Sequence, residues 1–103
     1  MTRQDFIFTL FDNGNGLTLD QIWKIDDGLI DTIPDGVIED LQENNGMTYG
    51  YAAEIALDQA REVFINNLHD LPDMLELKNY LEEQEINVSD MQVYHVWIVT
   101  REV

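Results

Sequence analysis

The sequence predicts an α+β fold: a mostly helical single domain of about four helices, with a C-terminal β-strand in a small sheet or a dimer interface. Three features predict it. Apolar residues recur at helical spacing over residues 51–69. A helix-capping signature stands at Thr18 and Gln21. Residues 92–100 are dense in β-branched and aromatic side chains. With 103 residues, 45% of them apolar, the chain is expected to form one acidic globular domain over residues 1–103.

The first segment, residues 2–13, fits either a helix or a strand. Its apolar residues lie three to four positions apart, as in a helix, but Phe6, Phe8 and Leu10 also alternate, as in a strand. We favour the helix. The sequence Asn-Gly-Asn-Gly at residues 13–16 then predicts a turn, because these residue types tolerate positive φ angles.

The next helix has the most specific start in the chain. Thr18 and Gln21 form a capping box, in which each side chain bonds the backbone N–H of the other residue. Leu17 and Ile22 flank the box as a hydrophobic staple. The helix is expected to run from Leu19 to Asp27. Its expected core residues are Ile22, Trp23 and Ile25.

Three more helices are expected before the C-terminal strand. Pro34 suits the first turn of one helix, and Asn45-Gly46 closes it. The longest helix is expected over residues 51–69 and another over residues 72–84. The residues expected to face the core are Ile33, Val37, Ile38 and Leu41 in the first, Ala52, Ala56, Ala60, Val63 and Phe64 in the second, and Met74, Leu77, Tyr80 and Leu81 in the third.

Residues 92–100 are interpreted as a strand covered on both faces, because the run is almost continuously apolar. A lone strand leaves its backbone groups without partners. Three partners fit: the N-terminal segment read as a strand, a short hairpin through residues 86–88, or the same strand in a second copy, which gives a homodimer.

The charge and composition of the chain exclude several classes of function. Twenty-one acids and five bases give a net charge of −16, which repels the phosphates of nucleic acids and of anionic membranes. The chain has no cysteine, so disulfides and cysteine nucleophiles are excluded. The N-terminal residues lack the pattern of a secretory signal, and no run of 18 apolar residues occurs. We therefore expect a cytoplasmic protein, located in the host cytoplasm if a phage encodes it.

No motif indicates catalysis or a bound cofactor. A glycine-rich phosphate loop and a nucleophile elbow are both missing. Residues 12–16 are similar to the start of a calcium loop, but glycines occupy ligand positions 3 and 5, and Leu17 stands where glycine is required. His69 and His95 are more typical of a helix end and a packed core than of metal ligands. We expect no enzymatic activity, no metal and no cofactor.

The acids form rows with a four-residue period. Between Lys24 and Arg61 there are nine acids and no base. On a helix, like charges four residues apart cost about 0.2–0.5 kcal/mol per pair, so the rows indicate a surface for a strongly positive partner. Tyr49 and Tyr51 lie beside these acids and are typical of binding anchors. The candidate partner-binding residues are Asp27, Asp31, Asp35, Glu39, Asp40, Glu43, Tyr49, Tyr51, Glu54, Asp58 and Glu62.

One row leads to a mutational expectation. Replacing Glu54, Asp58 and Glu62 by Lys is expected to abolish inhibition of the partner and to leave the fold intact or more stable, because the row is expected on the outer side of the long helix. A plainer interpretation is also open, in which the acids serve only solvation or adaptation to high salt.

Residues 3–45 resemble the start of a winged helix-turn-helix. Leu17–Ile22 correspond to the entry into a second helix, and Pro34–Glu43 take the place of the recognition helix. That position carries Asp35 and Glu39 and no Arg or Lys, so the resemblance implies the scaffold without its DNA-reading use.

Charge and size together resemble the small acidic DNA-mimic proteins that phages and mobile elements use against restriction or CRISPR systems. Four residues of helix advance about 6 Å along the helix axis. This distance is close to the axial distance between alternate phosphates of one DNA strand, because consecutive phosphates lie about 3.4 Å apart. A compact domain of this length spans about 34 Å, along which duplex DNA carries roughly 20 phosphate charges.

The resemblance implies an inhibitor of the anti-restriction or anti-CRISPR type. Such a protein occupies the positively charged nucleic-acid-binding surface of a host defence protein or another DNA- or RNA-binding protein. The alternative is an immunity protein or antitoxin that neutralises a basic nuclease or toxin.

Overall fold

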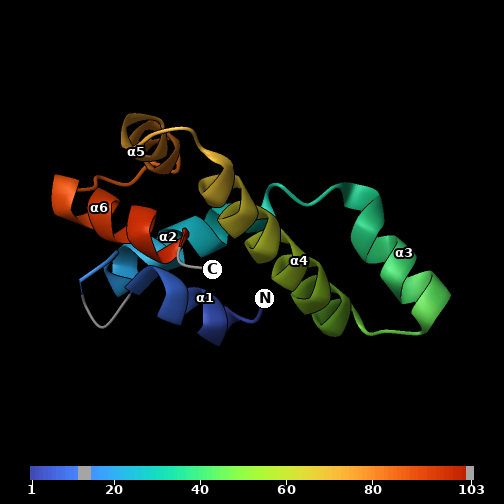
Figure 1. Cartoon of the computed structure of the whole chain (residues 1–103). Helices are drawn as coiled ribbons and strands as arrows, with labels where there is room; N and C mark the ends of the chain where they lie inside the picture. Colours follow the sequence, from blue (N-terminus) through green and yellow to red (C-terminus); the bar gives the residue numbers. More distant parts are fainter. Residues whose placement is uncertain (12–14, 102–103) are drawn as a thin grey trace.

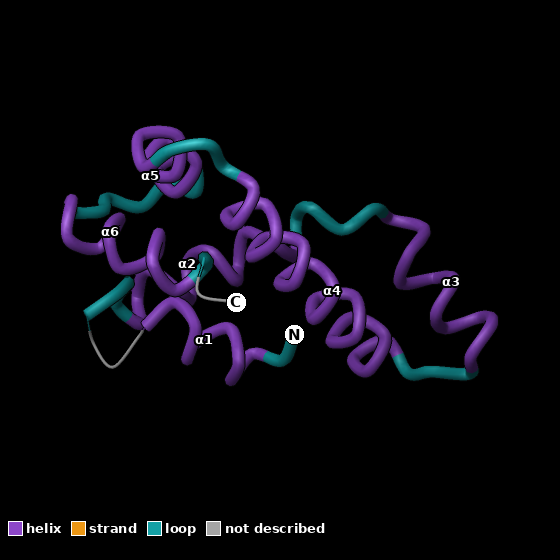
Figure 2. The backbone as a smooth tube through the Cα atoms, viewed as in Figure 1, coloured by secondary structure: helices purple, strands orange, loops and turns teal. Residues whose placement is uncertain are grey.

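The computed structural model describes residues 1–11 and 15–101, and this part of the chain holds six helices and no strand (Figure 1, Figure 2). The prediction of an α+β fold with a C-terminal strand is therefore wrong. The helices are α1 (Arg3–Phe11), α2 (Leu19–Ile30), α3 (Asp35–Asn45), α4 (Tyr49–Asp70), α5 (Met74–Glu82) and α6 (Asp90–Val99).

The helix α1 confirms the helical interpretation of the N-terminal segment, and it buries Phe6 and Leu10. Of the turn predicted at residues 13–16, Asn13 and Gly14 lie outside the described residues. Gly16 packs tightly against the end of α1, because a Cβ atom at this position would lie 2.1 Å from the carbonyl oxygen of Leu10. Only glycine fits this approach of two backbone segments.

The capping box at the start of α2 is confirmed. The Thr18 side chain accepts from the Gln21 backbone N–H, and the Gln21 side chain accepts from the Thr18 backbone N–H. α2 continues to Ile30, beyond the expected end, and Gly28 lies within the helix instead of ending it. Trp23 was expected in the core but is 53% exposed, so that prediction is wrong.

Residues 92–100 were predicted as a strand, but residues 92–99 belong to α6 and Thr100 is the C-cap residue of that helix. Ser89 and Gln92 form a second capping box, which has the same spacing as the first and starts the helix at Asp90. Val93 and Val96 lie three residues apart and are both buried, so one face of the helix enters the core. Packing of this face and the capping box outweigh the strand preference of β-branched residues.

The glutamine side chains of the two capping boxes form hydrogen bonds with each other. The Gln92 Nε2 group donates to Gln21 Oε1 at 2.8 Å, and Gln21 Nε2 donates back to Gln92 Oε1 at 3.3 Å. Gln21 Nε2 also donates to the backbone carbonyl of Asn87, and Gln92 Nε2 donates to that of Gly16 at 3.3 Å. These bonds hold the N-termini of α2 and α6 together across 71 residues of sequence.

The core lies between α1, α2, the C-terminal half of α4, α5 and α6. Phe6 of α1 meets Phe64 of α4 edge-on, with ring centroids 5.8 Å apart. Two residues predicted to face the core, Val63 and Met74, are exposed instead. The fully buried apolar residues of this core include Phe6, Leu10, Leu17, Ile22, Ile25, Leu68, Leu77, Leu81 and Val96.

No helix in the described part of the chain is both long enough and apolar enough to cross a membrane.

α3 lies at one end of an elongated molecule, which extends 44 × 26 × 24 Å, and packs against the first half of α4 (Figure 1). Pro34 is its N-cap residue, and Gly46 ends it at a φ of 65°, a left-handed conformation that favours glycine. No residue of α3 is fully buried. The fold does not match a winged helix-turn-helix beyond the resemblance in sequence, because α3 packs on α4 and the described residues form no wing strands.

The contact at Gly16 gives a test of the fold. Gly16→Ala should destabilise the protein by about 1–3 kcal/mol, because backbone must move to admit the new methyl group. Gly28→Ala is the matched control, and it should stabilise the protein by about 0.5–1 kcal/mol, since nothing lies within 4 Å of the added atom. Urea unfolding followed by circular dichroism measures both changes, and equal midpoints for the two variants would contradict the described turn.

Candidate functional site

The outer side of α3 carries a row of exposed carboxylates. Asp35, Glu39 and Glu43 follow one another at four-residue spacing, and Asp40 lies beside them. The half-buried residues of α3 take its opposite side, where the helix packs on α4. None of these four acids forms an ion pair with a base in the described residues. Their charge is therefore available to a partner. We call Asp35, Glu39, Asp40 and Glu43 the α3 row.

Two exposed tyrosines stand next to the α3 row. Tyr49 is 65% exposed and Tyr51 is 61% exposed, and both lie in the first turn of α4, directly after the short turn that follows Gly46. Thr48 caps this helix by accepting from the Tyr51 backbone N–H at 3.3 Å. The end of the molecule thus combines free carboxylates with aromatic side chains, as binding surfaces often do.

Asp27 lies in the last turn of α2, and Asp31 is the C-cap residue of this helix. Both are exposed and line a shallow hollow together with Lys24, Glu83 and Glu85. Acids at a helix C-terminus face the negative end of the helix dipole, so this group is electrostatically unfavourable within the molecule itself.

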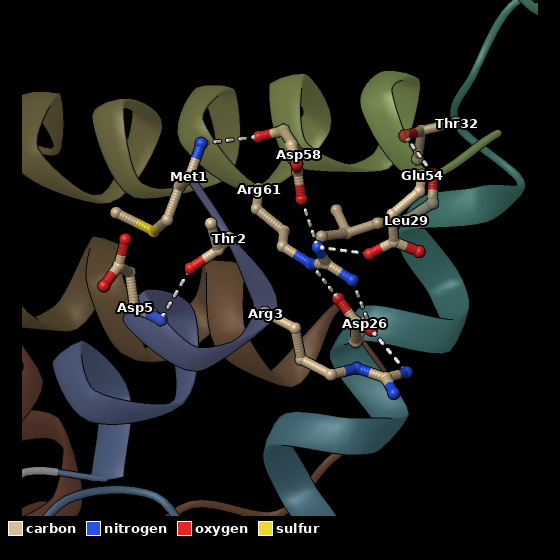
Figure 3. A network of polar contacts seen from close by, with 10 residues as sticks. All are labelled: Met1, Thr2, Arg3, Asp5, Asp26, Leu29, Thr32, Glu54, Asp58 and Arg61. Carbon is tan, nitrogen blue, oxygen red and sulfur yellow. Dashed lines mark hydrogen bonds and ion pairs between the residues drawn. The ribbon is translucent and has the colours of Figure 1, made fainter. Parts of the chain in front are cut away.

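The acids of α4 behave differently, because the molecule's own Arg61 binds two of them (Figure 3). The Arg61 side chain is 0% exposed and points from α4 toward α1 and α2. Its Nη1 group donates to Asp58 Oδ1 at 2.6 Å and to Glu54 Oε1 at 3.3 Å. Glu54 and Asp58 therefore belong to an internal network and not to a free acidic face.

The main partner of Arg61 is Asp26, which is buried in α2. Arg61 binds it through two parallel bonds, Nε to Oδ1 at 2.6 Å and Nη2 to Oδ2 at 3.1 Å. Arg3 of α1 reaches the same carboxylate, with Nη2 3.3 Å from Oδ2 (Figure 3). Burial lowers the pKa of the Arg61 guanidinium, but the bonds and charges of Asp26 and Glu54 outweigh this effect and raise that pKa. The guanidinium stays charged and joins three helices.

Glu62, the third acid predicted on α4, does not bind Arg61. Its Oε2 atom lies 3.6 Å from the amino group of Met1. The same amino group donates to the backbone carbonyl of Asp58 at 3.1 Å (Figure 3). The structure thus separates the predicted acids into the free α3 row, the hollow with Asp27 and Asp31, and three α4 acids that hold internal cations.

Two residues central to this network escaped the sequence reasoning, Asp26 and Arg61. A signal for Arg61 was present, because it falls in register with Leu57, Phe64 and Leu68 on the buried side of α4. A base at such a position predicts a buried ion pair, since an unpaired charge there would be too costly.

The two histidines lie in different surroundings. His69 is exposed, with Nδ1 3.4 Å from Asp70 Oδ1, and His95 lies half-buried in α6, its ring edge-on to that of Tyr94. Within the described ranges, no three His, Asp or Glu side chains are grouped so that they could hold a metal ion.

Comparison with known proteins returns no relationship: no family model, no curated protein and no solved structure matches this chain.

Because Arg61 binds Glu54 and Asp58, we now expect charge reversal of Glu54, Asp58 and Glu62 to disrupt the fold, contrary to the expectation from the sequence. Lysines at the first two positions would lie against a buried guanidinium. Loss of binding in such a variant would then report unfolding and not a binding surface.

Removing Arg61 tests the network directly. Arg61→Met should lower the free energy of unfolding by about 3–5 kcal/mol, because it leaves the buried Asp26 carboxylate with only Arg3. The double variant Arg61→Met with Asp26→Leu is the control and should recover most of the loss, since it removes both buried charges. Urea unfolding measures both. If the single variant is as stable as the unaltered protein, the network does not hold the helices together.

Proposed function

We propose that this protein is a non-catalytic DNA-mimic inhibitor. It occupies the positively charged nucleic-acid-binding surface of a host defence protein or of another DNA- or RNA-binding protein, in the cytoplasm. The proposal includes the anti-restriction and anti-CRISPR types of inhibitor. Inhibition is by competition, so the protein needs no metal, cofactor or catalytic residue.

The observation that carries the proposal is the α3 row. Its four carboxylates are exposed and have no basic partner in the described part of the chain, whereas the acids around Arg61 are neutralised internally. The row runs along one helix that projects from the end of the molecule (Figure 1). A protein that needed acids only for solvation would gain stability from interspersed bases on such an exposed helix.

The mimicry that we propose is local. The molecule is 44 Å long, a length over which duplex DNA carries roughly 26 phosphate charges, so its mean charge density is below that of DNA. Along α3, however, Asp35, Glu39 and Glu43 advance by about 6 Å per step, close to the spacing of alternate phosphates on one strand. A groove that binds one strand of DNA therefore suits this helix.

A specific observation also favours a second candidate, an immunity protein or antitoxin that neutralises a basic nuclease or toxin. Tyr49 and Tyr51 are exposed beside the α3 row, and tight protein–protein interfaces concentrate their binding energy in such aromatic residues. In this candidate the tyrosines supply most of the affinity and the acids steer the encounter.

A capture experiment tests the α3 row. The immobilised protein is incubated with a bacterial lysate at about 150 mM salt, and retained proteins are eluted with duplex DNA. We expect the eluted proteins to be basic nucleic-acid-binding proteins. Glu39→Lys with Glu43→Lys should reduce their capture by about tenfold or more, because close charge pairs at interfaces are worth several kcal/mol.

The matched control is Asp70→Lys with Glu82→Lys, at the ends of α4 and α5. Each pair of replacements changes the net charge from −16 by four, so both variants have the same total charge. The control should capture as much as the unaltered protein. Equal losses of capture in the two variants would show that only total charge matters. Captured proteins that duplex DNA cannot elute would contradict mimicry and favour the immunity or antitoxin function. In that case Tyr49→Ala should reduce capture more than Glu39→Lys with Glu43→Lys does.

A further inference from the structure

A mainly apolar groove of about 350 Å³ lies between α2, the start of α3, α4 and Tyr80 of α5. Its lining includes Ile33, Val37, Ala60 and Phe64, and no acidic or basic residue of the described chain lines it. This volume is within the range of about 300–1,000 Å³ that is typical of ligand pockets.

Two features indicate that the groove is incompletely covered in the protein alone. Val63, which lines it, is an aliphatic residue that is 56% exposed. The apolar residues of α3, Val37 among them, are only half-buried although the helix packs on α4. A partner that filled the groove would bury both, and buried apolar area contributes about 25 cal/mol per Å².

The margin of the groove is acidic. Residues 32–34 line it, and the exposed Asp31 and Asp35 stand immediately before and after them in the chain. The rest of the α3 row follows Asp35 along the same helix. An apolar groove with an acidic margin matches a helix that has aliphatic residues on one face and basic residues on its flanks. A second copy of this chain does not match, since it would bring a net charge of −16 to a surface of the same sign.

We propose that this groove binds a cationic amphipathic helix of the partner protein. The aliphatic side chains of that helix enter the groove and contact Val63, and its Lys and Arg side chains pair with Asp31 and Asp35. This inference rests on the proposed function, because it describes the element of the basic partner that the site holds. It adds an apolar contribution that DNA mimicry by itself does not include.

The test uses two synthetic peptides and fluorescence anisotropy at about 150 mM salt. The first is a fluorescein-labelled helical peptide with Leu on one face and Lys on the other. The second has the same number of Lys residues, with Ser in place of every Leu. The first should bind the full chain at least about tenfold more tightly, because only it can fill the groove.

Val63→Lys should weaken binding of the Leu/Lys peptide by about tenfold or more, since it removes an apolar contact and adds a repelling charge. Leu75→Lys is the matched control: this aliphatic residue is 67% exposed on α5, outside the groove, and its replacement makes the same changes in charge and apolar area. The control should bind within about twofold of the unaltered protein. Circular dichroism verifies that both variants are folded, which their exposed positions favour.

Several results would overturn the groove proposal. Equal affinities for the two peptides, or equal effects of Val63→Lys and Leu75→Lys, would show that binding depends only on total charge and not on the groove. Binding of the neutral dye Nile red that the Leu/Lys peptide cannot displace would identify a small-molecule pocket. A homodimer that Val63→Lys dissociates, seen by sedimentation, would identify an interface between copies. If Val63→Lys captured DNA-displaceable proteins as before while Glu39→Lys with Glu43→Lys did not, the proposed function would stand and the groove proposal alone would fail.

Discussion

The buried guanidinium of Arg61 is the interaction on which the rest of the structure depends. A charged group without water must be paired and fully hydrogen-bonded, and Arg61 meets this condition only when α2 and α4 are in place together, while Arg3 of α1 binds the same Asp26 carboxylate. Its Nε, Nη1 and Nη2 groups all donate, to Asp26, Asp58 and Glu54. No buried side-chain nitrogen or oxygen in the described residues lacks a partner. Because desolvation offsets much of the attraction between such charges, the network acts mainly on specificity: it permits one arrangement of these three helices.

The same interaction determines which part of an acidic molecule can bind another protein. Arg61 and Arg3 neutralise carboxylates near the middle of the molecule, while the α3 row, at the projecting end, has no basic partner in the described chain. The result is an uneven surface field, in which the negative charge without basic partners is concentrated on α3 and not on both predicted rows. Long-range attraction of a basic protein would then be directed to the end that carries α3, Tyr49 and Tyr51, where electrostatic steering and aromatic contacts act together.

Local patterns in the sequence predicted much of the helical structure but not the contacts between helices. The capping box at Thr18, the end of α3 at Gly46 and the extent of α4 were predicted, because each depends on neighbouring residues. The strand prediction failed because β-branched composition was weighed above the capping signature that begins at Ser89. The division of the acids could not be predicted from a charge pattern, because it depends on Asp26 meeting Arg61 from 35 residues away.

The amide pair that joins the starts of α2 and α6 has a consequence for the unfolded chain. Residues 92–100 have the composition of a strand, apolar and rich in valine, and in the folded protein the capping box at Ser89 and the buried Val93 and Val96 accompany the helical conformation of residues 92–99. Released from the core, such a segment pairs readily with copies of itself and seeds aggregation. The hydrogen bonds between Gln21 and Gln92 therefore help to keep this segment docked, where it cannot pair with other chains. Repulsion between molecules with a net charge of −16 also opposes aggregation.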